Sequence, residues 1–210
     1  MAIRNIIFDL GVVLFDLDFS RVEESFKRSG IANFNEIYTY HKQNPLFEEF
    51  EKGMLDDKGF CDEIRKITQS NLSDAAIENA WNSLLVDIPK ARADFVISLR
   101  SKFRVFLLSN TNSMHIKGFE QLLSQQHGPD LFRRMFDKVY FSCELKLRKP
   151  DETIFRRVLE ENAMKPEETL FIDDVEENTR AASRLGIQTI WLKPGEEAID
   201  TVNHYLKKQS

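Results

Sequence analysis

The sequence predicts an α/β protein with a doubly wound parallel sheet (a Rossmann-like core) and a small helical insertion after the first strand. Apolar strand-like runs alternate with amphipathic helical segments through the second half of the chain, which is typical of parallel sheets. Several of these runs end on polar side chains. Between the first and second runs lie roughly 70 residues with helical patterns, which is longer than a simple crossover needs.

The first strand is the apolar run Ile6-Ile7-Phe8, which leads directly into Asp9. Apolar residues do not alternate with polar ones here, so we expect a strand buried on both faces. The carboxyl end of a parallel strand lies at the edge where open α/β proteins bind ligands. Asp9 is therefore the first candidate for chemistry, although a carboxylate here can also simply cap a turn.

The next segment, 16–87, is expected to form a small helical subdomain, with 1–15 and 88–210 forming the core domain. Ser20 and Glu23 have the spacing of a capping box for its first helix. Further helices are expected from 34, from 45, over 56–68 and over 73–85, with no strand among them. Most large apolar residues here are expected to pack in a core: Phe47, Phe50, Phe60 and Trp81. Three polar residues are candidates for substrate specificity if their helices face the site: His41, Glu48 and Glu51.

The remaining elements follow in regular order. Strands are expected over 105–108, 139–142, 170–172 and 190–192. Helices are expected over 89–100, 116–126, 152–162, 178–185 and 196–207, and Gly186 is suited to end the fourth of these.

Polar residues follow three of the strands: Asp9, Ser109 and the pair Asp173-Asp174. Parallel strands end at one edge, so these groups are expected to meet. Clustered carboxylates repel one another unless a hard divalent cation such as Mg²⁺ lies between them. Taken singly, Ser109 suits a turn, Lys149 a solvated charge, Asn178 a helix surface and Asp173-Asp174 a helix N-terminus. Their joint occurrence favours a site.

The composition narrows the class of protein. Of 210 residues, 42% are hydrophobic, 30% are charged and 17 are Phe, which indicates a folded protein with an aromatic-rich core. The net charge of −5 and the absence of basic blocks argue against a nucleic-acid partner. No signal-like or membrane-spanning run is found, and Cys61 and Cys143 are far apart, so we expect a cytoplasmic protein with reduced thiols.

Four short segments carry a family resemblance: Asp9-Leu10-Gly11, Ser109-Asn110, Lys149-Pro150-Asp151 and Asp173-Asp174-Val175-Glu176-Glu177-Asn178. In order and spacing they resemble the four motifs of the haloacid dehalogenase superfamily, over residues 3–193. The insertion resembles the helical cap of the first subclass. The chain looks most similar to sugar-phosphate phosphatases of the α-glucose-1-phosphatase type and to phosphatase domains related to epoxide hydrolases.

This resemblance implies a Mg²⁺-dependent phosphatase acting on a small phosphorylated metabolite, such as a sugar phosphate. Asp9 would be the nucleophile that forms an aspartyl phosphate. Mg²⁺ would be bound by Asp9, the Gly11 carbonyl and Asp174, with Asp173 and Asn178 orienting its shell. Ser109, the Asn110 amide and Lys149 would bind and stabilise the phosphoryl group. No membrane partner is expected, and the chain would be a monomer or a homodimer.

One position departs from the family pattern. Most phosphatases of this superfamily carry an acid/base Asp where this chain has Gly11. Three explanations are open: the leaving group needs no acid or is protonated by water, Asp16 or Asp18 substitutes, or turnover is slow. A metal-independent 2-haloacid dehalogenase and a weakly active phospho-ligand-binding protein therefore remain as alternatives. His41, His115, His127 and His204 are expected to be structural or on the surface. Lys146 and Arg148 are expected to be solvated, unless one of them contacts the substrate.

Overall fold

The computed structural model describes residues 2–31, 34 and 45–209. Its centre is a parallel five-stranded sheet of order β5-β4-β1-β6-β7. The strands are β1 (Asn5–Phe8), β4 (Arg104–Ser109), β5 (Lys138–Phe141), β6 (Thr169–Asp173) and β7 (Gln188–Trp191). The predicted doubly wound α/β fold is confirmed, and β1 is the central strand, flanked by β4 and β6.

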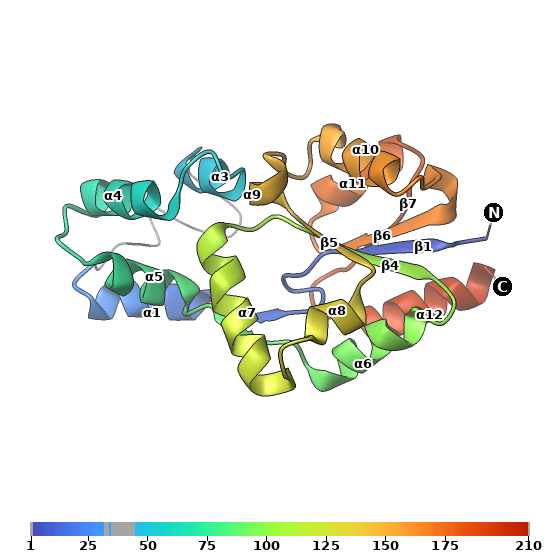
Figure 1. The fold of residues 1–210 in the computed structure, drawn as a ribbon, viewed down its shortest axis with the longest axis horizontal. Coiled ribbons are helices and arrows are strands. Elements are labelled where there is room, and N and C mark those ends of the chain that lie inside the picture. The colour runs from blue at the N-terminus through green and yellow to red at the C-terminus, as the bar shows by residue number, and fades with distance from the viewer. Residues whose placement is uncertain (1, 32–33, 35–44, 210) are drawn as a thin grey trace.

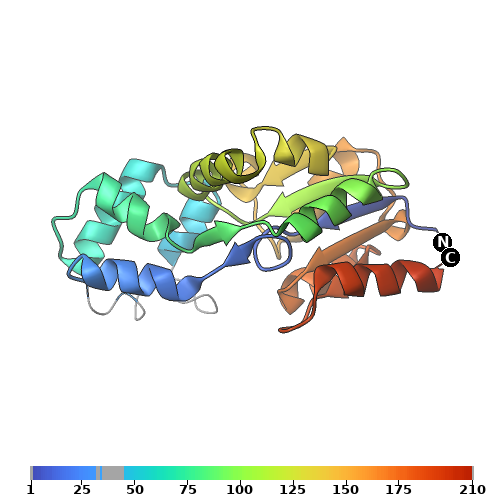
Figure 2. The same ribbon diagram turned by 90° about the horizontal axis from the view of Figure 1, so that it is seen from below.

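Helices cover both faces of this sheet (Figure 1). One face carries α6 (Lys90–Leu99), α7 (Ser113–His127), α8 (Leu131–Met135) and α12 (Ala198–Gln209). The other carries α10 (Glu152–Glu161) and α11 (Glu176–Arg184). The two chain termini lie close together at the end of the sheet away from the helical insertion (Figure 2).

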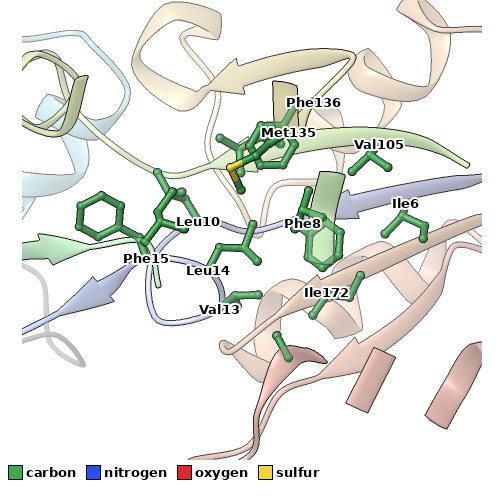
Figure 3. Close-up of a cluster of buried hydrophobic side chains, with 14 of the residues drawn as sticks. Ile6, Phe8, Leu10, Val13, Leu14, Phe15, Val105, Met135, Phe136 and Ile172 are labelled. Atoms are coloured by element: carbon green, nitrogen blue, oxygen red, sulfur yellow. The ribbon is translucent and has the colours of Figure 1, made fainter. Parts of the chain in front are cut away.

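The burial of β1 explains its unbroken apolar run. Ile6 and Phe8 point into the cluster beneath α6, α7, α8 and α12 (Figure 3), whereas Ile7 packs on the α10–α11 side. All three side chains have no exposed surface. Full burial of each such side chain contributes about 1.5–3 kcal/mol, so the strand that carries Asp9 is a rigid support.

The insertion after β1 has its own hydrophobic cluster. It contains α1 (Phe19–Arg28), α3 (Pro45–Glu51), α4 (Asp57–Thr68) and α5 (Asp74–Asn82). The four large residues expected to pack do so: Phe47, Phe50, Phe60 and Trp81 are all buried in this cluster. The helices lie together beyond one end of the sheet (Figures 1 and 2). The helix expected from residue 34 falls largely outside the described residues, as does His41.

The two ends of the insertion form a short pair of strands that the sequence analysis did not predict. Asp16–Leu17 (β2) pairs antiparallel with Leu85–Asp87 (β3) where the chain leaves and re-enters the core. Runs of two and three half-buried residues are too short to show a period. The expected Ser20 capping box is also wrong, because Asp18 is the N-cap of α1 and accepts from the Ser20 N–H at 3.1 Å.

Short elements account for the other differences. Ser142 begins helix α9 (Ser142–Leu145) rather than ending a strand. Neither α8 nor the 3-10 turn at Pro166–Glu168 was predicted, because one turn of helix leaves no periodic pattern. No helix among the described residues has the length and apolar character needed to cross a bilayer.

Candidate active site

The polar residues that follow the strands meet at one cavity of about 440 Å³. All eight predicted site residues line it: Asp9, Gly11, Ser109, Asn110, Lys149, Asp173, Asp174 and Asn178. They come from the ends of β1, β4 and β6, from the first turn of α11, and from the loop between α9 and α10. The parallel topology therefore brings together segments that are far apart in the sequence.

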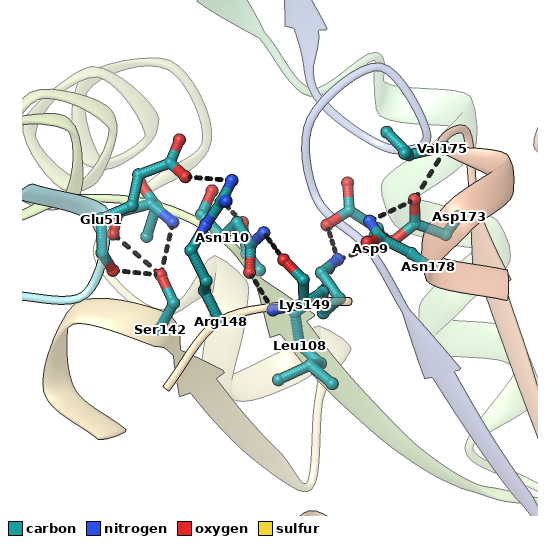
Figure 4. A network of polar contacts seen from close by, with 12 residues as sticks. Asp9, Glu51, Leu108, Asn110, Ser142, Arg148, Lys149, Asp173, Val175 and Asn178 are labelled. Carbon is teal, nitrogen blue, oxygen red and sulfur yellow. Dashed lines mark hydrogen bonds and ion pairs between the residues drawn. The ribbon is translucent and has the colours of Figure 1, made fainter. Parts of the chain in front are cut away.

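Lys149 is the centre of this group, and only 1% of its surface is exposed. Its Nζ donates to Asp9 Oδ1 at 2.5 Å, to Asp173 Oδ2 at 2.7 Å and to the Leu108 carbonyl at 2.9 Å (Figure 4). Three acceptors match the three N–H bonds of an ammonium group. The lysine thus fixes the relative positions of the carboxylates that follow β1 and β6.

Asp173 is held from a second side as well. Its Oδ1 accepts from the Val175 N–H at 2.8 Å and from Asn178 Nδ2 at 3.0 Å. With these bonds and the one from Lys149, the carboxylate has donors on both oxygens. Asp173 and Asn178 are therefore suited to orient neighbouring groups, and Asp174 is the more accessible member of the acidic pair.

Burial and neighbouring negative charges disfavour the ionised form of Asp9. Burial raises the pKa of Asp9 against the lowering effect of Lys149, and the charges of Asp173 and Asp174 raise it further. For Lys149, burial alone would lower the pKa, but Asp173 and Asp9 more than offset this and raise it. One ammonium faces three carboxylates, so the site favours additional positive charge.

The donor set fits Mg²⁺. Among the described residues, no three His, Cys, Asp or Glu side chains are grouped as a complete metal site. Mg²⁺ does not need such a group, because it usually takes one or two carboxylates and completes its shell with water and phosphate oxygens. Asp9, Asp174 and the Gly11 carbonyl could supply the protein oxygens. The surplus negative charge described above is the feature that a divalent cation would balance.

The loop after Asp9 is tight. The Leu10 carbonyl accepts from the N–H groups of Leu14 and Phe15, and the Gly11 carbonyl accepts from Val13 N–H at 2.6 Å. Val12 has φ +64°, a left-handed conformation that is unfavourable for a β-branched residue. The loop is thus held in one conformation by its own hydrogen bonds, with Gly11 at the cavity wall.

Asn110 binds the loop that carries Lys149. Its Nδ2 donates to the Lys149 carbonyl at 2.9 Å, and its Oδ1 accepts from the Lys149 N–H at 2.9 Å (Figure 4). This reciprocal pair uses the Asn110 side chain. Its backbone N–H and the Ser109 hydroxyl remain the groups suited to bind an anion.

Neither suggested substitute for an acid/base Asp reaches the cavity. Asp16 pairs with Arg92 at 2.7 Å, and Asp18 caps α1. Neither residue is among those that line the cavity. The neighbour of Gly11 is instead Leu17, since a Cβ added at Gly11 would lie 2.9 Å from Leu17 Cδ1.

Other lining residues were not predicted as site residues. His115 and Trp81 line the cavity, whereas His115 was expected to be structural or on the surface. Arg148 was expected to be solvated, but its side chain is only 17% exposed and pairs with Glu51 at 2.8 Å. Glu48 and Glu51 do line the cavity. His115 lies in the first turn of the helix that follows Ser109-Asn110, and this position is the one sequence signal that could have marked it.

Comparison with known proteins matches residues 3–186 to the family model of haloacid dehalogenase-like hydrolases. The chain belongs to this family. The hydrolase is 28% identical, over 93% of its length and 94% of the relative's, to the D-ribitol-5-phosphate phosphatase of Bacteroides thetaiotaomicron. It is also 39% identical to a family enzyme of the same species that was solved in complex with magnesium and inorganic phosphate. The two structures superimpose with a TM-score of 0.86 over 93% of this chain and 96% of the other.

A more distant structure shares the fold. The L-2-haloacid dehalogenase of Xanthobacter autotrophicus is 17% identical to this hydrolase, with a TM-score of 0.64 and 98% and 83% of the two chains covered. At this identity the likeness shows the common architecture alone, and the choice between phosphate and haloacid chemistry depends on the site.

Proposed function

We propose that this hydrolase is a Mg²⁺-dependent phosphatase that cleaves a small phosphorylated sugar or polyol through an aspartyl-phosphate intermediate. The observation that carries the proposal is the buried Asp9–Lys149–Asp173 group at the carboxyl ends of the central strands. The relatives support it, since one is named as a ribitol-phosphate phosphatase and another was solved with magnesium and phosphate.

Asp9 is the nucleophile in this proposal. One carboxylate oxygen attacks phosphorus, the bond from phosphorus to the substrate oxygen breaks, and the leaving oxygen takes its proton from water. Water then attacks the phosphorus of the aspartyl phosphate, which releases inorganic phosphate and restores the Asp9 carboxylate. Two displacements replace one more difficult step.

The surrounding residues neutralise and position charge. Lys149 donates to Asp9 Oδ1, which orients the nucleophile and lowers its pKa against the raising effect of burial. Ser109 and the Asn110 amide bind the phosphoryl oxygens. Asp9, Asp174 and the Gly11 carbonyl hold Mg²⁺, while Asp173 and Asn178 orient its surroundings. The metal, when bound, offsets the negative charge that the phosphoryl group brings to three carboxylates.

Segment 16–87 is proposed to act as a cap on the core formed by 1–15 and 88–210. Its residues Leu17, Glu48, Trp81 and Leu85 line the same cavity as Asp9. Cap and core are also joined by polar contacts, such as that of Ser142 Oγ with the Glu51 carbonyl at 2.6 Å. A cap in this position can exclude water and contact the organic part of a substrate.

Gly11 takes the position of the usual acid/base residue, and this affects the rate of turnover. With Leu17 beside it, no acid/base carboxylate occupies this position. General acid catalysis contributes about 10²–10⁴-fold, so its absence slows but does not abolish phosphate release. We therefore expect turnover to depend strongly on the quality of the leaving group. A cytoplasmic location and a monomeric or homodimeric state stay predictions.

The test is phosphate release from a panel of sugar and polyol phosphates with Mg²⁺, with and without EDTA, for the wild type and for Asp9→Asn. We expect Mg²⁺-dependent release that is lost in the variant. Full activity of Asp9→Asn would refute the assignment of the nucleophile. Dehalogenation of 2-haloacids that persists in EDTA would support the dehalogenase alternative, and tight binding without release would support the phospho-ligand-binding alternative.

A further inference from the structure

His115 lies in the wall of the active-site cavity, in the first turn of α7. The backbone here is fixed, because Asn112 caps α7 and its Oδ1 accepts from the His115 N–H at 3.0 Å. The same short segment carries Ser109 and Asn110 at its other end. The position of the imidazole is therefore fixed relative to Ser109 and Asn110, which are proposed to bind the phosphoryl group.

The hydrogen bonds of Asn82 determine which ring nitrogen of His115 carries the proton. Asn82 Nδ2 donates to the Met114 carbonyl at 3.2 Å, so Asn82 Oδ1 is the atom that faces His115 Nδ1, at 2.8 Å. An amide oxygen only accepts hydrogen bonds, so Nδ1 must be the protonated nitrogen. In a neutral ring, Nε2 then carries a lone pair.

The surroundings keep the ring neutral and in place. Burial lowers the pKa of His115 to about 3. Trp81 stacks on one face of the ring, with centroids 4.9 Å apart and planes 14° from parallel. One turn further on, a Cβ added at Gly118 would lie 2.8 Å from Asn82 Nδ2, so α7 approaches α5 too closely there for a larger residue. Asn82 is thus closely packed against α7 beside His115.

Nε2 is the remaining polar atom of this ring, and no described residue bonds to it. Trp81, Leu84, Leu85 and Phe119 also line the cavity, so the ring is surrounded mainly by apolar surfaces. A lone pair among such surfaces accepts a hydrogen bond from a hydroxyl and disfavours a second anionic group. The carbon chain of a polyol can pack at the same time on Leu17 and Leu85, which are half-buried and line the same cavity.

We propose that His115 Nε2 accepts a hydrogen bond from a hydroxyl group in the organic part of the substrate, which makes His115 a specificity-determining residue for phosphorylated polyols. The inference rests on the proposed phosphatase function and adds the feature by which the substrate is chosen. A site built to bond a hydroxyl discriminates against analogues without it, because its own polar group is then left unpaired.

The experiment compares His115→Phe and His115→Gln with the wild type on ribitol 5-phosphate and on p-nitrophenyl phosphate, which has no hydroxyl to bond. Phe keeps an aromatic ring against Trp81 but removes the lone pair, whereas Gln keeps an acceptor. We expect His115→Phe to lower kcat/KM for ribitol 5-phosphate by about 10- to 100-fold, mainly through KM. Hydrolysis of p-nitrophenyl phosphate should fall much less than hydrolysis of ribitol 5-phosphate, and Gln should restore part of the loss.

His204→Phe is the matched control, because His204 is exposed on α12 and does not line the cavity. It should leave both substrates unaffected. An equal loss on both substrates in His115→Phe would indicate a structural role and overturn the proposal, as would no loss on either. If the wild type hydrolyses neither phosphate, the phosphatase function itself fails and this inference fails with it.

Discussion

Replacing Lys149 by Met tests the buried charge group at the centre of the site. Met has a similar length but no charge, so the substitution leaves Asp9 and Asp173 without their shared donor. Asp9 is 8% exposed and Asp173 is 0% exposed, so neither carboxylate can regain full hydration. Breaking a buried ion pair by removing one partner costs about 3–5 kcal/mol, and here two carboxylates lose the same partner.

We therefore expect Lys149→Met to lower the free energy of unfolding by about 3–5 kcal/mol when measured in EDTA. In a chain of this size, that corresponds to a melting temperature lower by about 6–20 °C. Urea unfolding followed by circular dichroism measures the first quantity and a thermal scan the second. Phosphatase activity should fall by at least about 10²-fold, because a positive group at the reacting centre is lost.

The matched control is Lys102→Met, since Lys102 is exposed in the turn between α6 and β4. A surface substitution of this kind should change the stability by less than about 0.5 kcal/mol. If Lys149→Met also changes it by less than about 1 kcal/mol, then the lysine does not hold the two carboxylates together and the reasoning is refuted.

Three further predictions follow from other features. Gly11→Asp displaces the end of the Leu17 side chain and supplies an acid. Hydrolysis of alkyl phosphates should therefore rise by up to about 10²-fold relative to hydrolysis of p-nitrophenyl phosphate, and an unchanged ratio would show that protonation of the leaving group does not limit turnover. Gly53→Ala should lower the free energy of unfolding in urea by about 1–3 kcal/mol more than Gly128→Ala does. Both glycines have positive φ, but only at Gly53 would a Cβ collide with the Cys143 carbonyl, at 2.2 Å, so equal losses of stability would contradict the prediction. The pKa of His115 is lowered to about 3 in the folded protein, so below about pH 6.5 the unfolded chain protonates this imidazole before the folded chain does. The free energy of unfolding should therefore decline by at most about 1.4 kcal/mol per pH unit as the pH falls. His115→Gln should remove that part of the decline, whereas the same decline in wild type and variant would show that the ring already titrates normally.

The sequence predicted the central architecture because long periodic segments and buried strands leave strong patterns. Asp9, Ser109 and Asp173 could be assigned to one edge, since the ends of parallel strands meet there. Their convergence with Lys149 follows from topology and needs no side-chain detail. The helices of the insertion were also predictable, although the two-residue strand β2 and its partner β3 were too short to be recognised.

Apart from Glu48 and Glu51, the cavity wall outside the four motifs could not be predicted. His115 acquires its place from a hydrogen bond to Asn82, which lies 33 residues earlier in the chain. Arg148 is next to Lys149 in sequence but pairs with Glu51 on α3. Such contacts depend on how the insertion packs against the core, and a single sequence carries no periodic signal for that packing.

The most direct test of the proposed mechanism is to trap the covalent intermediate. Turnover of ribitol 5-phosphate with Mg²⁺ is quenched in acid, and peptides from the protein are analysed by mass spectrometry. The account predicts a phosphoryl group on the carboxylate of Asp9, labile to hydroxylamine and absent from Asp9→Asn. Phosphate release without any phosphorylated Asp9 peptide, or with the phosphoryl group on another residue, would contradict it.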